Sequence, residues 1–209
     1  MRASALTPTY APLPFGNHPA AGSDSGTSLT MSPEAVARFD ALLHEIHPDA
    51  LRVDAPRLQA LAGWLASLSL EDARAVLDLR LKRIEQLRAM LDDPQWDPDD
   101  AMRARLAKLL GYIDLDEDVI PDSTPLLGLL DDVLLFELAW PAFEAEAEEY
   151  RDFCHYRIDE HPDGDGAHQR AAWLRDRLAE LALLQHNARV NDSHYANGRI
   201  PDRVFRISG

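Results

Sequence analysis

A long helical pattern runs from residue 69 to residue 93 and reads SLEDARAVLDLRLKRIEQLRAMLDD. Its first residue, Ser69, is a favoured N-cap, and the acids at 71 and 72 suit the positive end of a helix. This stretch predicts a long amphipathic helix that packs against other helices of the same domain, and pairing of two copies along it is the alternative. Apolar residues recur in it at close to heptad spacing, at Ala73, Leu77, Leu81, Ile84, Leu87 and Leu91.

Two further helices are predicted before this one. Ser32-Pro33 and Asp54-Ala55-Pro56 each combine a capping side chain with a proline that suits the first helical turn. Apolar residues at helical spacing follow both signals, and His47-Pro48 ends the first of these helices.

Apolar residues also recur at helical spacing after residue 93. One helix is predicted to begin at Asp97-Pro98 and another at Thr124-Pro125. The latter continues into the apolar run 133–143, in which Glu137 is the only charged residue, a pattern typical of a buried helix. An acidic helix over 144–157 and a last helix complete the chain, and the last helix carries Ala171, Leu174, Leu178, Leu181 and Leu184 on one face. No stretch alternates as a strand does, so the sequence predicts an all-α fold, a compact bundle of about six helices.

Composition divides the chain into three parts. Residues 1–31 are rich in Pro, Gly, Ser and Thr without periodicity, which predicts a flexible N-terminal arm. Tyr10, Leu13 and Phe15 give this arm apolar side chains that could dock. Residues 32–190 are predicted to form a single helical domain, and residues 191–209 a polar C-terminal tail.

Charge is distributed very unevenly along the chain. The 209 residues carry a formal net charge of −15, and residues 93–168 alone hold 21 acidic and five basic side chains. Residues 169–209 are net basic, with seven basic and four acidic side chains. The acidic region disfavours direct binding of nucleic acid, because phosphates require Lys and Arg. The like charges of this region repel one another, so they need to be compensated by a basic segment of the chain, by divalent cations or by a basic partner.

Cysteine content and hydropathy exclude several classes. One cysteine rules out a disulfide framework and a zinc site built from several thiolates. No apolar run approaches the roughly 18 residues of a membrane span, and the first residues lack the layout of a signal peptide. The sequence therefore predicts a cytoplasmic protein.

A distinctive motif lies between the fourth and fifth predicted helices, at residues 112–132, and reads YIDLDEDVIPDSTPLLGLLDD. It resembles the signature of the YkvA-like family, a bacterial domain of unknown function. That family shows a Tyr, then Asp-x-Ile-Pro-Asp, x-x-Pro, x-x-Gly and x-x-Asp-Asp, and one departure is Asp116, where the family usually has Pro. The resemblance implies a helix–connector–helix unit over about 109–140 and no established activity. The matching positions are Tyr112, Asp118, Ile120, Pro121, Asp122, Pro125, Gly128, Asp131 and Asp132.

The aspartates of this connector have two interpretations. In the structural one, they accept backbone N–H groups of the turn, or pair with Arg103 or Arg105 on a facing helix. In the functional one they bind a divalent cation, because clustered carboxylates suit Mg²⁺ or Ca²⁺. The candidate ligands are Asp118, Asp122, Asp131 and Asp132.

An EF-hand loop does not fit this stretch, because Val119 stands where that loop requires Gly and Pro125 where it requires Glu. The sequence also lacks a Gly-rich phosphate loop, a nucleophile elbow and a His-Glu-x-x-His motif. Cys154 and His155 are adjacent and would point about 100° apart on a helix, which prevents a dyad. No catalytic or cofactor-binding residue is predicted.

These patterns favour a non-enzymatic interaction or regulatory protein whose acidic surface binds a basic protein partner. The alternative is a divalent-metal-binding module, or a metal-dependent enzyme, built on the connector aspartates. A homodimer is compatible with the leucine-rich stripes. Membrane association is disfavoured, because an acidic face is repelled by anionic lipid.

Overall fold

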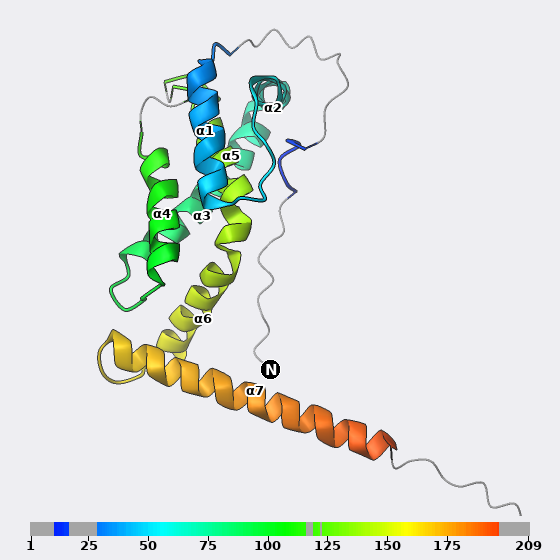
Figure 1. The fold of residues 1–209 in the computed structure, drawn as a ribbon, viewed down its shortest axis with the longest axis vertical. Coiled ribbons are helices and arrows are strands. Elements are labelled where there is room, and N and C mark those ends of the chain that lie inside the picture. Colours follow the sequence, from blue (N-terminus) through cyan, green and yellow to red (C-terminus); the bar gives the residue numbers. More distant parts are fainter. Residues whose placement is uncertain (1–10, 17–28, 116–118, 122, 197–209) are drawn as a thin grey trace, which may run out of the picture. The chain divides into compact units, whose positions relative to one another are not determined.

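The computed structural model describes residues 11–16, 29–115, 119–121 and 123–196. This part of the chain is helical and contains no strand, so the all-α prediction is confirmed (Figure 1). The helices are α1 (Pro33–Ile46), α2 (Ala55–Ser67), α3 (Leu70–Asp92), α4 (Asp100–Ile113), α5 (Leu130–Ala139), α6 (Glu144–Glu160) and α7 (Gly166–Ala196), with one 3₁₀ turn at Trp140–Ala142.

The chain divides into two compact units, Met1–Arg151 and Asp152–Gly209. The sequence predicted one helical domain over 32–190, whereas this division falls inside α6. The first unit contains α1 to α5 and the first turns of α6, and the second contains the rest of α6 and α7. Helix α7 also continues beyond residue 190, as far as Ala196.

The core of the first unit is built around α5. This helix packs against α1, α3 and α4, and in Figure 1 it lies among them. Protein surrounds it on every side, which explains why its sequence is apolar nearly all round instead of showing one stripe. The predicted buried helix is therefore present. Its fully buried apolar residues are Leu130, Val133, Leu134, Leu135, Phe136 and Ala139.

Two helices begin later than the sequence predicted. Helix α4 starts at Asp100, because the side chain of Asp99 caps it by accepting the N–H of Met102. Helix α5 starts at Leu130 and not at Thr124-Pro125. One turn does form there, closed by a hydrogen bond from the Gly128 N–H to the Thr124 carbonyl. It does not continue as a helix, because Leu126 adopts a left-handed φ of 68°.

The buried face of α3 differs from the predicted stripe at two positions. Arg80 and Met90 are buried, whereas Leu81 and Leu91 are half-buried. A straight helix repeats every 3.6 residues, so a heptad pattern drifts around its surface. The consequence is that an arginine enters the core and needs a charged partner there.

That partner is Glu137 of α5, whose carboxylate accepts a hydrogen bond from Arg80 Nε at 2.5 Å. The other carboxylate oxygen accepts the N–H of Leu13, and the guanidinium also donates to the carbonyl of Ala11. Leu13 and Phe15 are buried, each with 6% of its surface exposed. Residues 11–16, which belong to the predicted flexible arm, are thus anchored to α3 and α5.

The second unit is held together by Trp173. Its ring meets Phe153 of α6 edge to face at 5.6 Å, and its indole N–H donates to Asp152 at 2.8 Å. The guanidinium of Arg177 covers the same ring at 5.0 Å. Within the described residues, no helix combines the length and hydropathy that crossing a membrane requires.

Candidate functional site

Asp131 and Asp132 lie in the first turn of α5, and they are the only buried acids among the residues that the structure describes. The sequence placed them in the second turn of a helix that began at Pro125. Their true position differs because the helix starts five residues further on, at Leu130. The first turn of a helix offers unbonded N–H groups and a positive dipole end, both of which stabilise carboxylates.

One carboxylate oxygen of Asp131 joins three parts of the connector. It accepts hydrogen bonds from the Tyr112 hydroxyl at 3.0 Å and from the N–H groups of Val119 and Ile120, each at 3.2 Å. The end of α4, the turn at 119–120 and the start of α5 are therefore tied to one side chain. This is the backbone-binding role of the structural interpretation. Arg103, one of the two arginines predicted as partners, instead binds Asp97 at 3.0 Å.

The predicted metal site is described only in part. Asp118 and Asp122 lie outside the described residues. Among the residues that are described, no group of three or more His, Cys, Asp or Glu is arranged to hold a metal ion. The four-aspartate site stays a prediction.

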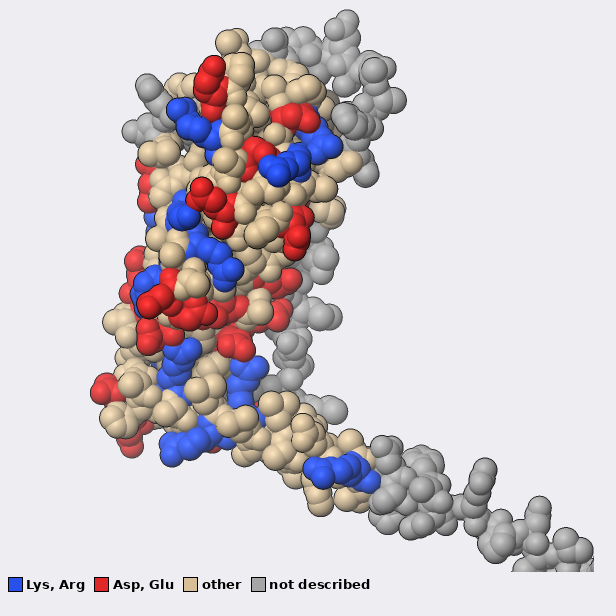
Figure 2. Space-filling view, in the orientation of Figure 1, with Lys and Arg blue, Asp and Glu red and all other residues tan. Residues whose placement is uncertain are grey.

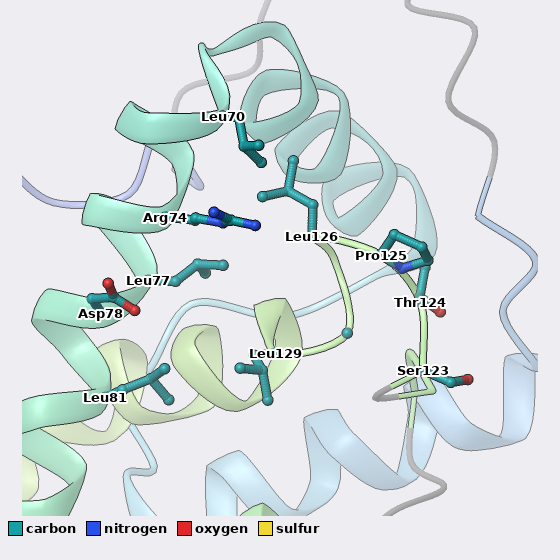
Figure 3. A pocket seen from close by; sticks show the side chains of 11 residues that line it. Leu70, Arg74, Leu77, Asp78, Leu81, Ser123, Thr124, Pro125, Leu126 and Leu129 are labelled. Carbon is teal, nitrogen blue, oxygen red and sulfur yellow. The ribbon is translucent and has the colours of Figure 1, made fainter.

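An open groove of about 430 Å³ lies between α3 and the turns at residues 123–129. Leu77 and Leu81 of α3 form one wall, and Leu126 and Leu129 form the other (Figure 3). Arg74 extends from α3 across the groove toward Leu126. Its lining is mostly apolar and includes one basic and one acidic side chain, those of Arg74 and Asp78.

The left-handed backbone of Leu126, which lines this groove, predicts the relative stability of two substitutions at that position. Leu126→Gly is expected to be more stable than Leu126→Ala by about 1 kcal/mol, because only Gly adopts φ > 0 without steric cost. Both variants lose every contact that the leucine makes beyond its Cβ, so their difference comes mainly from the backbone. Urea denaturation of the two variants measures it. The usual order in helices and strands, with Ala more stable than Gly, would contradict the observed φ of 68°.

Two acidic segments that are distant in sequence meet at the start of α6. The Trp96 indole N–H donates to Glu146 at 3.0 Å, and the Tyr150 hydroxyl donates to Asp93 at 3.1 Å. The two aromatic rings also meet edge to face at 5.5 Å. These contacts hold residues 92–100 against residues 144–149, and neither segment contains a Lys or Arg.

We call the joined segments the acidic patch. Figure 2 shows acidic side chains gathered close together on the face in view. The sequence predicted a charged region over 93–168 and an acidic helix over 144–157, but nothing in it paired that helix with the aspartates of 92–100. The patch consists of Asp92, Asp93, Asp97, Asp99, Asp100, Glu144, Glu146, Glu148 and Glu149.

His44 and His47, at the end of α1, both have backbone partners. His44 Nδ1 lies 2.6 Å from the carbonyl of Asp40, and its Nε2 lies 3.1 Å from that of Ala50. His47 Nδ1 lies 2.8 Å from the carbonyl of Leu138 on α5. Both rings thus fasten the end of α1 to neighbouring backbone.

No protein-family model, curated protein or solved structure matches this chain. The resemblance of the connector to the YkvA-like family stays a prediction. The acidic patch and the connector are therefore the features from which a function is inferred.

Proposed function

We propose that this protein is a non-enzymatic interaction module whose acidic patch binds a basic segment of a partner protein. The observation that carries the proposal is the convergence of nine carboxylates from two segments that contain no basic residue. Most of these side chains are exposed, and only Asp93 and Glu146 are half-buried.

The aromatic contacts make this patch suitable for binding. Carboxylates gathered on one surface repel each other and create a negative potential that attracts and orients cationic groups. Trp96 and Tyr150 hold the two segments in place before any partner arrives. A preformed surface loses less conformational entropy on binding, which favours affinity.

The proposal predicts partner capture that depends on salt and on these carboxylates. The tagged protein is used to capture partners from its own cell extract at about 0.1 M and about 1 M salt, where the Debye length falls from about 10 Å to about 3 Å. A basic partner retained at low salt should be released at high salt. A variant with Asp92→Asn, Asp100→Asn, Glu144→Gln and Glu148→Gln should lose it.

A matched control removes four exposed acids outside the patch, with Asp49→Asn, Glu71→Gln, Asp78→Asn and Glu85→Gln. This control has the same net charge as the patch variant and should retain the partner. Equal loss in both variants would show a general charge effect. Binding that resists salt would exclude the electrostatic proposal.

Divalent-cation binding by the connector aspartates is the second candidate function. The burial of Asp131 and Asp132, at 0% and 2% exposure, supports it, because buried carboxylates gain from a nearby positive charge. Asp118 and Asp122 would complete an all-oxygen ligand set suited to Mg²⁺ or Ca²⁺. Thermal unfolding with and without either ion tests this candidate, since a ligand that binds the folded state raises the midpoint.

A further inference from the structure

Helix α7 carries an apolar seam that is exposed to solvent. Leu174, Leu178 and Leu181 have 45%, 65% and 51% of their surfaces exposed. Within residues 166–190, only Trp173 is buried. A helical stripe of leucines normally packs against another helix. The α7 seam consists of Ala171, Leu174, Leu178, Leu181, Gln185 and Ala188, at alternating spacings of three and four residues.

The seam is distinct from the side of α7 that packs on α6. Trp173 makes the ring contact with Phe153 and the hydrogen bond to Asp152. Consecutive residues of a helix point about 100° apart, so Trp173 and Leu174 face different directions. The contact with α6 therefore leaves the seam uncovered within the second unit.

The positions that flank the seam carry one sign of charge. In a heptad, the flanking e and g positions face the partner helix and decide which partner is accepted. Three e and three g positions flank the α7 seam between residues 170 and 189. Four of these six residues are arginine, the other two are Ala182 and Leu184, and none is acidic. Asp176 and Glu180 occupy positions away from the seam. The flanking arginines are Arg170, Arg175, Arg177 and Arg189. Arg177 also covers the Trp173 ring at 5.0 Å and lies 3.9 Å from Asp152, so it borders both the seam and the contact with α6.

We propose that the α7 seam docks on a helix of a partner protein whose own apolar seam is flanked by Asp or Glu. Charge complementarity selects this occupant over a second copy of the chain. Parallel pairing of two α7 helices would place Arg170 against Arg175 of the second copy, and antiparallel pairing would gather the arginines of both helices with no acid among them. This surface differs from the acidic patch and requires the opposite charge in its partner, so each proposal can fail without the other.

The test uses the full chain and two designed helical peptides. Both peptides have three heptads with leucine at positions a and d, and they differ only in having Glu or Lys at positions e and g. Fluorescence anisotropy should show that the Glu peptide binds at least about tenfold more tightly, equivalent to about 1.4 kcal/mol. This difference should shrink as salt rises.

Substitutions on α7 locate the binding surface. The double variant Leu178→Asp with Leu181→Asp should lose the Glu peptide. Leu183→Asp with Val190→Asp is the matched control, because it adds the same charge at side chains that are 60% and 37% exposed on the same helix but lie off the seam. The control should bind as the wild type does. All of these side chains are exposed, so circular dichroism should show the same helix content in each variant.

Four outcomes would overturn the proposal. They are equal binding of both peptides, binding of neither, equal loss in the control variant, and dimerisation of the wild-type chain that the seam variant abolishes. The last outcome, seen by sedimentation velocity, would assign the seam to a second copy.

Discussion

Arg80→Met is expected to lower the free energy of unfolding by about 3–5 kcal/mol, the usual cost of removing one partner of a buried ion pair. Arg80 is 2% exposed, and its guanidinium donates to Glu137 and to the carbonyls of Val76 and Ala11. Methionine fills a similar volume but donates nothing. Glu137 would then keep its charge in a largely buried place without its guanidinium partner.

Two controls separate the buried charge from other effects of the substitution. In the double variant Arg80→Met with Glu137→Leu, no lone charge remains, and most of the lost stability should return. Arg88→Met removes an arginine of the same helix that binds Asp114 at the surface, and it should cost less than about 1 kcal/mol. Chemical denaturation measures all three variants. A single variant no less stable than the double would contradict the role of the pair.

The double variant Arg80→Met with Glu137→Leu should release the segment at residues 11–16. The N–H of Leu13 donates to Glu137, and the carbonyl of Ala11 accepts from Arg80. Hydrogen exchange at the Leu13 amide should therefore accelerate in that double variant, which removes its acceptor, and stay slow in Arg88→Met.

Asp131→Ala should give the second large effect, a loss of about 3 kcal/mol. The substitution leaves the buried N–H groups of Val119 and Ile120 and the hydroxyl of Tyr112 without this acceptor, and each buried polar group left unsatisfied costs about 1–3 kcal/mol. Tyr112→Phe removes one of the three donors and should cost about 1 kcal/mol. Urea denaturation of both variants measures these changes.

The Asp131 variant also separates the two interpretations of the connector. If its carboxylate has a structural role, the loss should be the same in the presence of a chelator and in the presence of Mg²⁺ or Ca²⁺. If it is a metal ligand, the ions should stabilise the wild type and not the variant. A loss that vanishes in chelator would therefore contradict the structural interpretation.

Local signals in the sequence located most of the helices. Ser32, Asp54 and Ser69 each cap a helix, as predicted, by accepting an N–H of its first turn. These signals are readable because a cap and the helix that it starts lie within four residues of each other. The all-α class follows from the same local periodicity.

The start of α5 could not be read in this way. Thr124-Pro125 has the composition of a helix start, but Leu126 takes a left-handed conformation and postpones the helix to Leu130. No local preference of leucine predicts that conformation, which tertiary packing must stabilise. Asp131 thereby comes to lie in the first turn, where it can accept the N–H groups of the connector.

The charged residues can be located from the sequence, whereas their partners cannot. The order of residues shows that Glu137 interrupts an apolar run and that acids crowd residues 93–168. The packing of the helices is what brings Glu137 to Arg80 and residues 92–100 to residues 144–149. The physical reason is that spacing along the chain fixes which face of a helix a residue occupies, whereas the residue opposite that face depends on how helices far apart in sequence pack together.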